Sequence, residues 1–386
     1  MKVFEKNWVK ALEQRYSSVS KYTTPFIAKL ALDPDLSREK NKIEEWFQPL
    51  PEDVKPDILG RLRNESSSQH FSAFHELVLY YFFKSIGYCV TLHPKLEDGE
   101  PDLLVTGGNL DKPIIVEVAT VFDEPEWRKE EQKLNLILGR LNRIQHYFFI
   151  DVSVESEHIP GKVNYKRLNR FVKAQLDNLY SKAPQSSHEI EYQEDGLQLR
   201  LTAFPSLEKG PIVASYGLPA RSIGAAQLRS MIIKKVNKYK GVKKRGLSFV
   251  IALNITNMPA GEHGLLRELF GKEKITIKRR NGEPISSEWG IDFSGLLTPK
   301  PGLEGRAQNR RLSAVLNVKS RWLEREVENE QARRVHFFRV IHNPWASNPL
   351  SHEFFNGYPQ YNKISEDQTG MSLGWSDEGV EKPFDC

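Results

Sequence analysis

The sequence predicts an α/β protein in which helices flank a mixed sheet, and three stretches lead to that prediction. Residues 67–86 form the clearest helix, with a broad apolar face that is ended by Gly87. Residues 100–121 hold two short β-branched runs separated by a turn rich in Gly, Asn, Asp and Pro, which predicts an antiparallel hairpin. Residues 225–254 join a basic amphipathic helix to an apolar strand. A chain of 386 residues can bury a substantial core around these elements, in one large domain or two.

The order of the segments predicts a core with additions on both sides. Residues 1–65 are expected to form an N-terminal helical segment, because Trp8, Leu12 and Tyr16 recur at four-residue spacing. Residues 66–260 are expected to form the core, with an insertion at about 123–219, and residues 261–386 a C-terminal α/β extension packed on that core. The insertion is inferred because the expected closing helix and strand come only after it.

The remaining elements follow from apolar periodicity and turn residues. Residues 88–93 are expected to form a strand, with His93 at its end. Further helices are predicted over 124–145, 162–179, 225–240 and 261–271, and further strands over 146–154, 190–192, 197–203, 248–254, 313–318 and 335–341.

Composition excludes several classes of protein. Hydrophobic content of 39% and charged content of 27% are ordinary for a globular protein, and there is no run of apolar residues long enough to span a membrane. Cys89 and Cys386 are the only cysteines, so a disulfide scaffold or a cysteine-built zinc site is not available. With no signal-peptide core at the N-terminus, we expect a cytoplasmic protein without a membrane partner. The net charge of +5 is only mildly basic, but basic residues cluster at 234–245 and 277–280.

Two carboxylates in the predicted hairpin point to a metal site. Glu117 interrupts a strand that reads as buried on both faces, where an unpaired charge is costly. Ile115, Glu117 and Ala119 share one face of that strand, and Asp102 begins the neighbouring strand. Paired carboxylates suit a hard cation such as Mg²⁺, or Mn²⁺ in its place. The alternative is a buried Glu117 that pairs with a lysine or arginine from elsewhere in the chain.

The pattern around these carboxylates resembles the PD-(D/E)XK nuclease superfamily, which has the restriction-endonuclease-like fold. Pro101-Asp102 is followed by fourteen residues and then by Glu117-Val118-Ala119, so Ala119 stands where that superfamily usually has a lysine. The resemblance implies metal-dependent hydrolysis of phosphodiester bonds, with Asp102, Glu117 and the Val118 carbonyl as metal ligands. It also implies a role for Glu76, because a glutamate on the helix before the first core strand often joins the metal site. The alternative for Glu76 is a solvated residue on an amphipathic helix.

The resemblance further suggests a replacement for the missing lysine. Lys235 and Tyr239 lie four residues apart on the closing helix, so both are expected on one helix face. Some members of the superfamily carry a Gln or Lys followed four residues later by Tyr on this helix, and others have moved the catalytic lysine onto a helix. Lys235 is therefore the first candidate for the catalytic lysine, and Lys238 or Lys133 are weaker ones. The alternative is a solvated basic helix face.

The basic segment at 234–245 contains seven lysine or arginine residues in twelve. Such clustering beside a candidate active site suits contact with the phosphate backbone of a nucleic acid, and an exposed helix end is the alternative. The residues predicted to bind nucleic acid are Lys234, Lys238, Lys240, Lys243, Lys244 and Arg245.

These observations favour a Mg²⁺-dependent DNA endonuclease that makes single- or double-strand cuts, in restriction or phage defence by analogy. A double-strand cut would call for a homodimer or two sequential nicks. Two other classes stay open: a catalytically silent nucleic-acid-binding module that keeps the nuclease fold, and an interaction protein with a structural ion pair at Glu117. The sequence shows no phosphate-binding glycine loop and no serine nucleophile motif.

Overall fold

The computed structural model describes residues 1–386 except 18, 98, 109, 122–124, 184, 218–224, 240–245, 256–260, 281–282, 300–306, 324–332, 368–369, 377–378 and 386. The chain forms two compact units. The first unit contains residues 1–10, 26–122 and 223–386, and the second contains residues 11–25 and 123–222. The N-terminal helices and the C-terminal third thus belong to the same unit as the hairpin.

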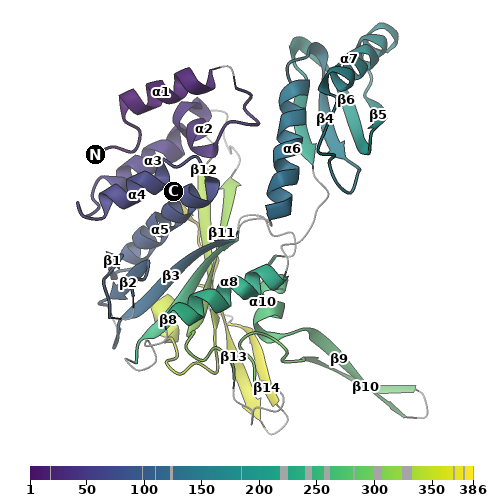
Figure 1. Cartoon of the computed structure of the whole chain (residues 1–386). Helices are drawn as coiled ribbons and strands as arrows, with labels where there is room; N and C mark the ends of the chain where they lie inside the picture. The colour runs from purple at the N-terminus through teal and green to yellow at the C-terminus, as the bar shows by residue number, and fades with distance from the viewer. Residues whose placement is uncertain are drawn as a thin grey trace. The chain divides into compact units, whose positions relative to one another are not determined.

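A large mixed sheet organises the first unit, and helices flank it, so the predicted α/β class is confirmed (Figure 1). The strand order is β1-β2-β3-β8-β11-β12-β13-β14, with β15 paired to β12. β1, β2 and β3 pair antiparallel, whereas β3 pairs with β8 and β8 with β11 in parallel. The strands are β1 (Cys89–Leu92), β2 (Leu103–Thr106), β3 (Ile114–Val121), β8 (Ser248–Ile255), β11 (Ala314–Leu323), β12 (Arg333–His342), β13 (Gln360–Asp367), β14 (Gly370–Trp375) and β15 (Phe384–Asp385).

Two layers of helices explain why β3 is almost continuously apolar. Val116 and Val118 face a core built with α5, whereas Ile115 and Ala119 face a second core built with α8 and α10. A strand covered on both faces is expected to be apolar throughout, which makes the charged Glu117 the exception in β3. The helices of this unit are α1 (Lys6–Tyr16), whose C-terminal part belongs to the second unit, α2 (Phe26–Leu32), η1 (Pro34–Leu36), α3 (Ser37–Phe47), α4 (Lys55–Leu62), α5 (Ser67–Ser85), α8 (Ala225–Lys238), α10 (Gly261–Phe270) and η2 (His352–Phe355).

The second unit has a separate hydrophobic core. Its four-stranded sheet has the order β5-β6-β4-β7. Tyr22 donates a hydrogen bond to the Val213 carbonyl over 3.2 Å, which ties the segment 11–25 to this sheet. The elements are α6 (Pro125–Leu141), β4 (Gln145–Val154), α7 (Tyr165–Lys182), β5 (His188–Glu194), β6 (Leu197–Pro211) and β7 (Val213–Gly217).

One further element, a two-stranded antiparallel ribbon, belongs to the first unit. It consists of β9 (Glu273–Arg280) and β10 (Glu283–Ile291), and it leaves the sheet beside α10 (Figure 1). Among the residues that the structure describes, no helix is both long and apolar enough to cross a membrane.

A buried polar cluster lies between α5 and β12 in the first unit. His70, His75 and His336 are each at most 3% exposed, and the Arg334 guanidinium lies among them with its Nη1 3.2 Å from Oε1 of Glu39. Burial, reinforced by the charge of Arg334, lowers the pKa of His70 to about 4 and that of His336 to about 3. The folded protein therefore holds these imidazoles neutral where the unfolded chain would protonate them.

This cluster predicts acid sensitivity of the first unit. Because the unfolded chain binds protons that the folded chain does not, stability is full above the ordinary histidine value of 6.5 and falls as the pH drops toward about 4. Each histidine contributes a slope of up to ~1.4 kcal/mol per pH unit. We expect His336→Asn, which keeps a group that can hydrogen-bond with the Ser320 hydroxyl, to flatten the slope by about that amount in urea unfolding. The matched control is His263→Asn, because the His263 side chain is 90% exposed. An unchanged slope in His336→Asn would contradict this interpretation.

Candidate functional site

Backbone hydrogen bonds hold Asp102 at the position where β2 begins to pair with β3. Leu103 pairs with Val116, so Asp102 lies next to Glu117 at the point where β2 begins. The Val118 N–H donates a hydrogen bond to Asp102 Oδ2 over 2.7 Å, and the His93 N–H donates to the Asp102 carbonyl over 3.0 Å. Backbone contacts from both neighbouring segments therefore fix the position of the Asp102 carboxylate.

Glu117 is fully buried, and its carboxylate contacts three side chains from the C-terminal end of α8 and the residue that follows it. Lys235 Nζ lies 2.5 Å from Glu117 Oε2, and Lys238 Nζ lies 3.0 Å from Oε1. The Tyr239 hydroxyl also hydrogen-bonds Oε1. Positions 235, 238 and 239 are i, i+3 and i+4, so one face of the helix delivers all three groups to the strand. The buried carboxylate that the sequence singled out is thus surrounded by donors.

Lys235 links the two carboxylates. Its Nζ lies 3.5 Å from Asp102 Oδ2 as well as 2.5 Å from Glu117, and its side chain is 26% exposed. Burial acts to lower the pKa of Lys235, but the charges of Asp102 and Glu117 outweigh burial and raise the pKa above its ordinary value. Lys235 is therefore a permanent cation at neutral pH.

The Asp102 carboxylate is destabilised in its charged form. Burial, followed by the negative charge of Glu117, raises its pKa from 3.8 to about 6, and the charge of Lys235 offsets only part of this effect. Folding thus favours the protonated form of Asp102. That contribution to stability is full below the ordinary value of 3.8 and is lost as the pH rises through about 6, so the ionised carboxylate costs stability at neutral pH.

We therefore expect Asp102→Asn to stabilise the protein at neutral pH. The pKa shift corresponds to about 3 kcal/mol at about pH 7.5, and the gain should fall to roughly half of that at about pH 5 and vanish below about pH 3.8. Urea unfolding of both proteins at the first two of these pH values measures this difference. A variant that is less stable than the wild type at neutral pH would contradict the electrostatic account of Asp102.

Glu76 forms a second cluster with Arg61 and His93. Arg61 from α4 contacts both Glu76 carboxylate oxygens, at 2.5 and 2.7 Å, and His93 Nε2 lies 3.1 Å from Oε2. Burial acts to raise the pKa of Glu76, but the hydrogen bonds from His93 and Arg61 outweigh it and lower the pKa. Hydrogen bonding to Glu76 also raises the pKa of His93. Glu76 is thus an ionised residue whose nearest partners are Arg61 and His93, and its charge contributes to the raised pKa of Asp102.

No pattern in the sequence pointed to Arg61 as a site residue. Arg61 lies on a short N-terminal helix, forty-one positions before Asp102, and only the packing of α4 on α5 brings it to Glu76. His93 was interpreted as a strand-end residue, and its backbone position agrees, but its ring contacts Glu76. A pairing of this kind depends on tertiary structure and has no periodic pattern in the sequence.

The other predicted basic residues lie elsewhere. In the second unit, Lys133 Nζ contacts Glu130 Oε1 at 2.7 Å and the Ile159 carbonyl at 2.6 Å. Lys234 is exposed on α8. Ala119, at the usual lysine position, is buried in the core between β3 and α8. The remaining predicted nucleic-acid contacts lie outside the described residues, and they are Lys240, Lys243, Lys244 and Arg245.

The donor chemistry at Asp102 and Glu117 fits a hard divalent cation. Mg²⁺ commonly takes one or two carboxylates and retains several waters. In the described part of the chain, both side-chain contacts of Asp102 fall on Oδ2, and its side chain is 18% exposed. Across the described residues there is no group of three or more His, Cys, Asp or Glu side chains that could hold a metal, so waters or backbone oxygens would complete the coordination. A cation at Glu117 would take the place of the Lys235 ammonium.

Comparisons with protein-family profiles, with curated proteins and with solved structures find no match to this chain, so the interpretation of the site depends on its own geometry.

Proposed function

We propose that this protein hydrolyses phosphodiester bonds in nucleic acid, with DNA as the substrate and Mg²⁺ or Mn²⁺ as the cofactor. One observation carries the proposal: a lysine from α8 lies within 2.5 Å of Glu117 and 3.5 Å of Asp102. Two carboxylates and a lysine form the catalytic set of the nuclease superfamily that the hairpin resembles. Lys235 would supply the positive charge that Ala119 cannot.

The order of the elements supports the same proposal. The chain runs through α5, then the antiparallel strands β1, β2 and β3, and later through α8 to β8, which lies parallel to β3. This helix–three strands–helix–strand order is the one expected for a restriction-endonuclease-like core. The second unit follows β3 directly, at the place where the sequence predicted an insertion.

In the proposed mechanism, Asp102 and Glu117 would hold the cation, and Glu76 would act on the site through its charge. A bound Mg²⁺ would supply Lewis-acid polarisation of the phosphate and a more acidic water. Lys235, as a permanent cation, would donate hydrogen bonds to the attacking water and to a phosphate oxygen, and would stabilise the charge that builds up on the phosphate. Its raised pKa makes it unsuited to act as the general base.

The charge balance also suits a phosphate ligand. Asp102 and Glu117 carry two negative charges and Lys235 and Lys238 two positive ones, so a divalent cation would leave the cluster with an excess of positive charge. The Lys238 side chain is 45% exposed and could turn toward a phosphate without a large desolvation cost. A phosphodiester anion, with one negative charge, would then offset half of that excess.

A second candidate is a catalytically silent nucleic-acid-binding module. The observation that favours it is the set of contacts around Glu117, in which Lys235, Lys238 and Tyr239 engage both carboxylate oxygens. In that case the ion pairs would be structural, and the cluster would bind no cation.

Incubation with supercoiled plasmid separates the two candidates. The proposed nuclease converts supercoiled plasmid to nicked or linear DNA with Mg²⁺ or Mn²⁺ and leaves it intact with EDTA. Binding to a labelled duplex in EDTA is measured in parallel. Metal-independent binding without any cleavage would favour the silent module, and the absence of both would refute both candidates.

A further inference from the structure

The β9–β10 ribbon is exposed on both faces. From Lys272 to Gly290, every residue whose side chain is described is exposed, including Ile275 at 48% and Ile277 at 49%. A two-stranded ribbon with no covered face is at best marginally stable in water. We therefore expect contact with a partner to stabilise the ribbon, and we call residues 272–291 the arm.

The base of this arm is fixed to the first unit. Gly271 has a φ of +115°, and a Cβ there would lie 2.1 Å from Asp292 Oδ1. The same Asp292 oxygen accepts hydrogen bonds from the Lys272 N–H over 2.8 Å and the Ser294 N–H over 3.0 Å. The two ends of the ribbon are thus joined where they leave the body of the protein. Each strand has eight or nine residues, so the arm extends by about 26 Å.

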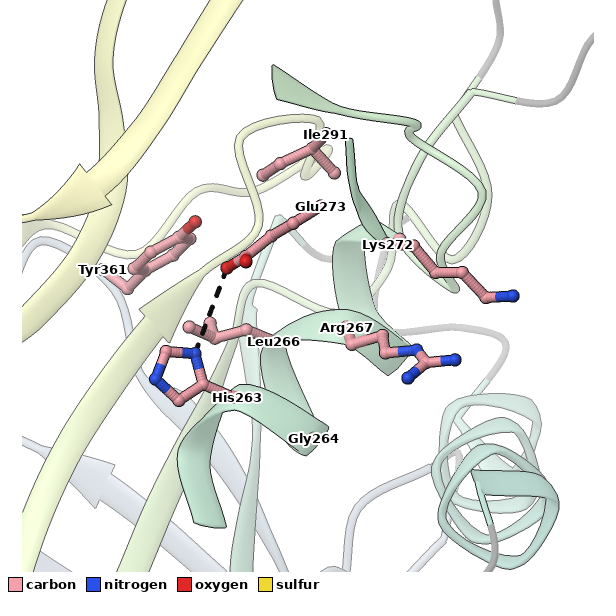
Figure 2. Close-up of a pocket in the computed structure, with 9 residues that line it drawn as sticks. His263, Gly264, Leu266, Arg267, Lys272, Glu273, Ile291 and Tyr361 are labelled. Atoms are coloured by element: carbon pink, nitrogen blue, oxygen red, sulfur yellow. Dashed lines mark ion pairs between the residues drawn. The ribbon is translucent and has the colours of Figure 1, made fainter. Parts of the chain in front are cut away.

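Basic side chains run from the base of the arm toward its tip. A cavity of about 480 Å³ lies at the base, and Figure 2 shows Arg267 and Lys272 on its wall, extending away from Tyr361. Along β9, Lys274, Lys278 and Arg280 are all exposed, and they share one face of the strand because they are four and two residues apart. These three cations therefore extend along one face of the ribbon from near its base to near its tip.

An apolar residue lies near the tip. The strand register shifts between Pro284 and Ser286, and Ile285 in this bulge is 62% exposed. A bulge changes the direction in which a side chain points. Ile285 therefore lies opposite the part of β9 that carries Lys278 and Arg280, in a stretch where Glu283 pairs with Arg280 and Ser286 with Lys278.

The arm belongs to the same side of the sheet as the candidate site. α10, which leads into β9, packs against α8 in the core that contains Leu228, Ile232, Leu265 and Leu269. α8 is also the helix that brings Lys235 to Asp102 and Glu117. A long polyanion bound along the arm would thus approach the face of the sheet that carries the carboxylates.

We propose that the β9–β10 ribbon is a DNA-binding arm that enters a groove of duplex DNA next to the site of cleavage. The inference rests on the proposed nuclease function and adds the element that holds the substrate. The major groove, about 12 Å wide, admits a two-stranded ribbon. Lys274, Lys278 and Arg280 contact phosphates, and Ile285 makes an apolar contact with a base edge in that groove, such as the methyl group of thymine.

The test measures binding of the full chain to a labelled duplex of about 30 bp in EDTA, across a range of salt concentrations. The triple variant Lys274→Ala/Lys278→Ala/Arg280→Ala should weaken binding roughly 10–100-fold and make the slope of log K against log salt shallower by about 2–3. Ile285→Ser should weaken binding without changing that slope. A matched control removes three exposed basic residues of the second unit, Lys162, Lys166 and Arg170, and should bind like the wild type.

The outcomes separate this inference from the nuclease proposal. If the wild type cleaves DNA while the arm variants bind with unchanged affinity and slope, the arm proposal is wrong and the nuclease proposal stands. An equal loss in the arm triple variant and in the control triple variant also overturns it, because total charge would then explain the effect. If Ile285→Ser instead abolishes self-association in sedimentation and no variant alters DNA affinity, the arm is a protein contact. Loss of binding confined to the arm variants supports the proposal, whether or not the plasmid is cut.

Discussion

Glu117→Gln is expected to abolish DNA cleavage. The substitution keeps the shape of the side chain and removes the negative charge that would bind the cation. Loss of a metal ligand removes several kcal/mol of transition-state stabilisation, which corresponds to at least ~10³-fold in rate. The measurement is the initial rate of plasmid nicking with Mg²⁺ and with Mn²⁺.

Glu117→Gln needs a control for folding, because Glu117 is part of a buried ion-pair cluster. Glu117 balances the charges of Lys235 and Lys238, so its neutralisation leaves two cations facing one remaining carboxylate, Asp102. Removal of one partner of a buried ion pair destabilises proteins by roughly 3–5 kcal/mol. The double variant Glu117→Gln/Lys238→Gln removes one negative and one positive charge, so the net charge of the cluster stays the same. It serves as the control for folding. Substantial cleavage by a folded double variant would contradict a metal-ligand role for Glu117.

Lys235→Ala is expected to lower the cleavage rate by roughly 10²–10⁴-fold, the range for loss of a positioned acid–base or charge-stabilising group. Lys238→Ala is the matched control, because Lys238 contacts Glu117 from the same helix, whereas the contact with Asp102 is made by Lys235. We expect less than ~10-fold from that control. Nicking rates of the two variants, measured side by side with purified protein, test the prediction.

Ala119→Lys tests whether the catalytic lysine of the superfamily has moved to α8 in this protein or has been lost. Ala119 is buried beside the α8 core, so a lysine there would bring a second cation close to Lys235. If Lys235 already fills the role, Ala119→Lys should slow cleavage through crowding and repulsion. A faster Ala119→Lys enzyme, together with an unaffected Lys235→Ala enzyme, would refute the idea that the lysine has moved to α8.

The sequence predicted the parts of the structure that depend on local pattern. The α5 helix, the β2–β3 hairpin and the α8–β8 pair follow from periodicity, β-branched runs and turn residues, which act over a few positions. The convergence of Lys235 and Tyr239 on Glu117 could be anticipated from their four-residue spacing on one helix.

Other features depend on tertiary contacts that no local pattern encodes. Arg61 reaches Glu76 only because α4 packs on α5, and residues 11–25 join the second unit although the sequence places them in an N-terminal helical segment. The basic cluster at 277–280 was visible in the sequence. Its place on an exposed ribbon depends on the pairing of β9 with β10, beside which the described residues form no third strand. Packing and pairing over long separations decide these features.

Single-turnover nicking of supercoiled plasmid by the wild type and by Asp102→Asn, with Mn²⁺, tests the central claim most directly. Asp102→Asn is expected to be more stable than the wild type at neutral pH, so a loss of activity cannot be assigned to unfolding. The account predicts that the wild type nicks the plasmid and that Asp102→Asn leaves it supercoiled over the same period. Equal nicking by both proteins, or an intact plasmid with folded wild type in Mg²⁺ and in Mn²⁺, would contradict it.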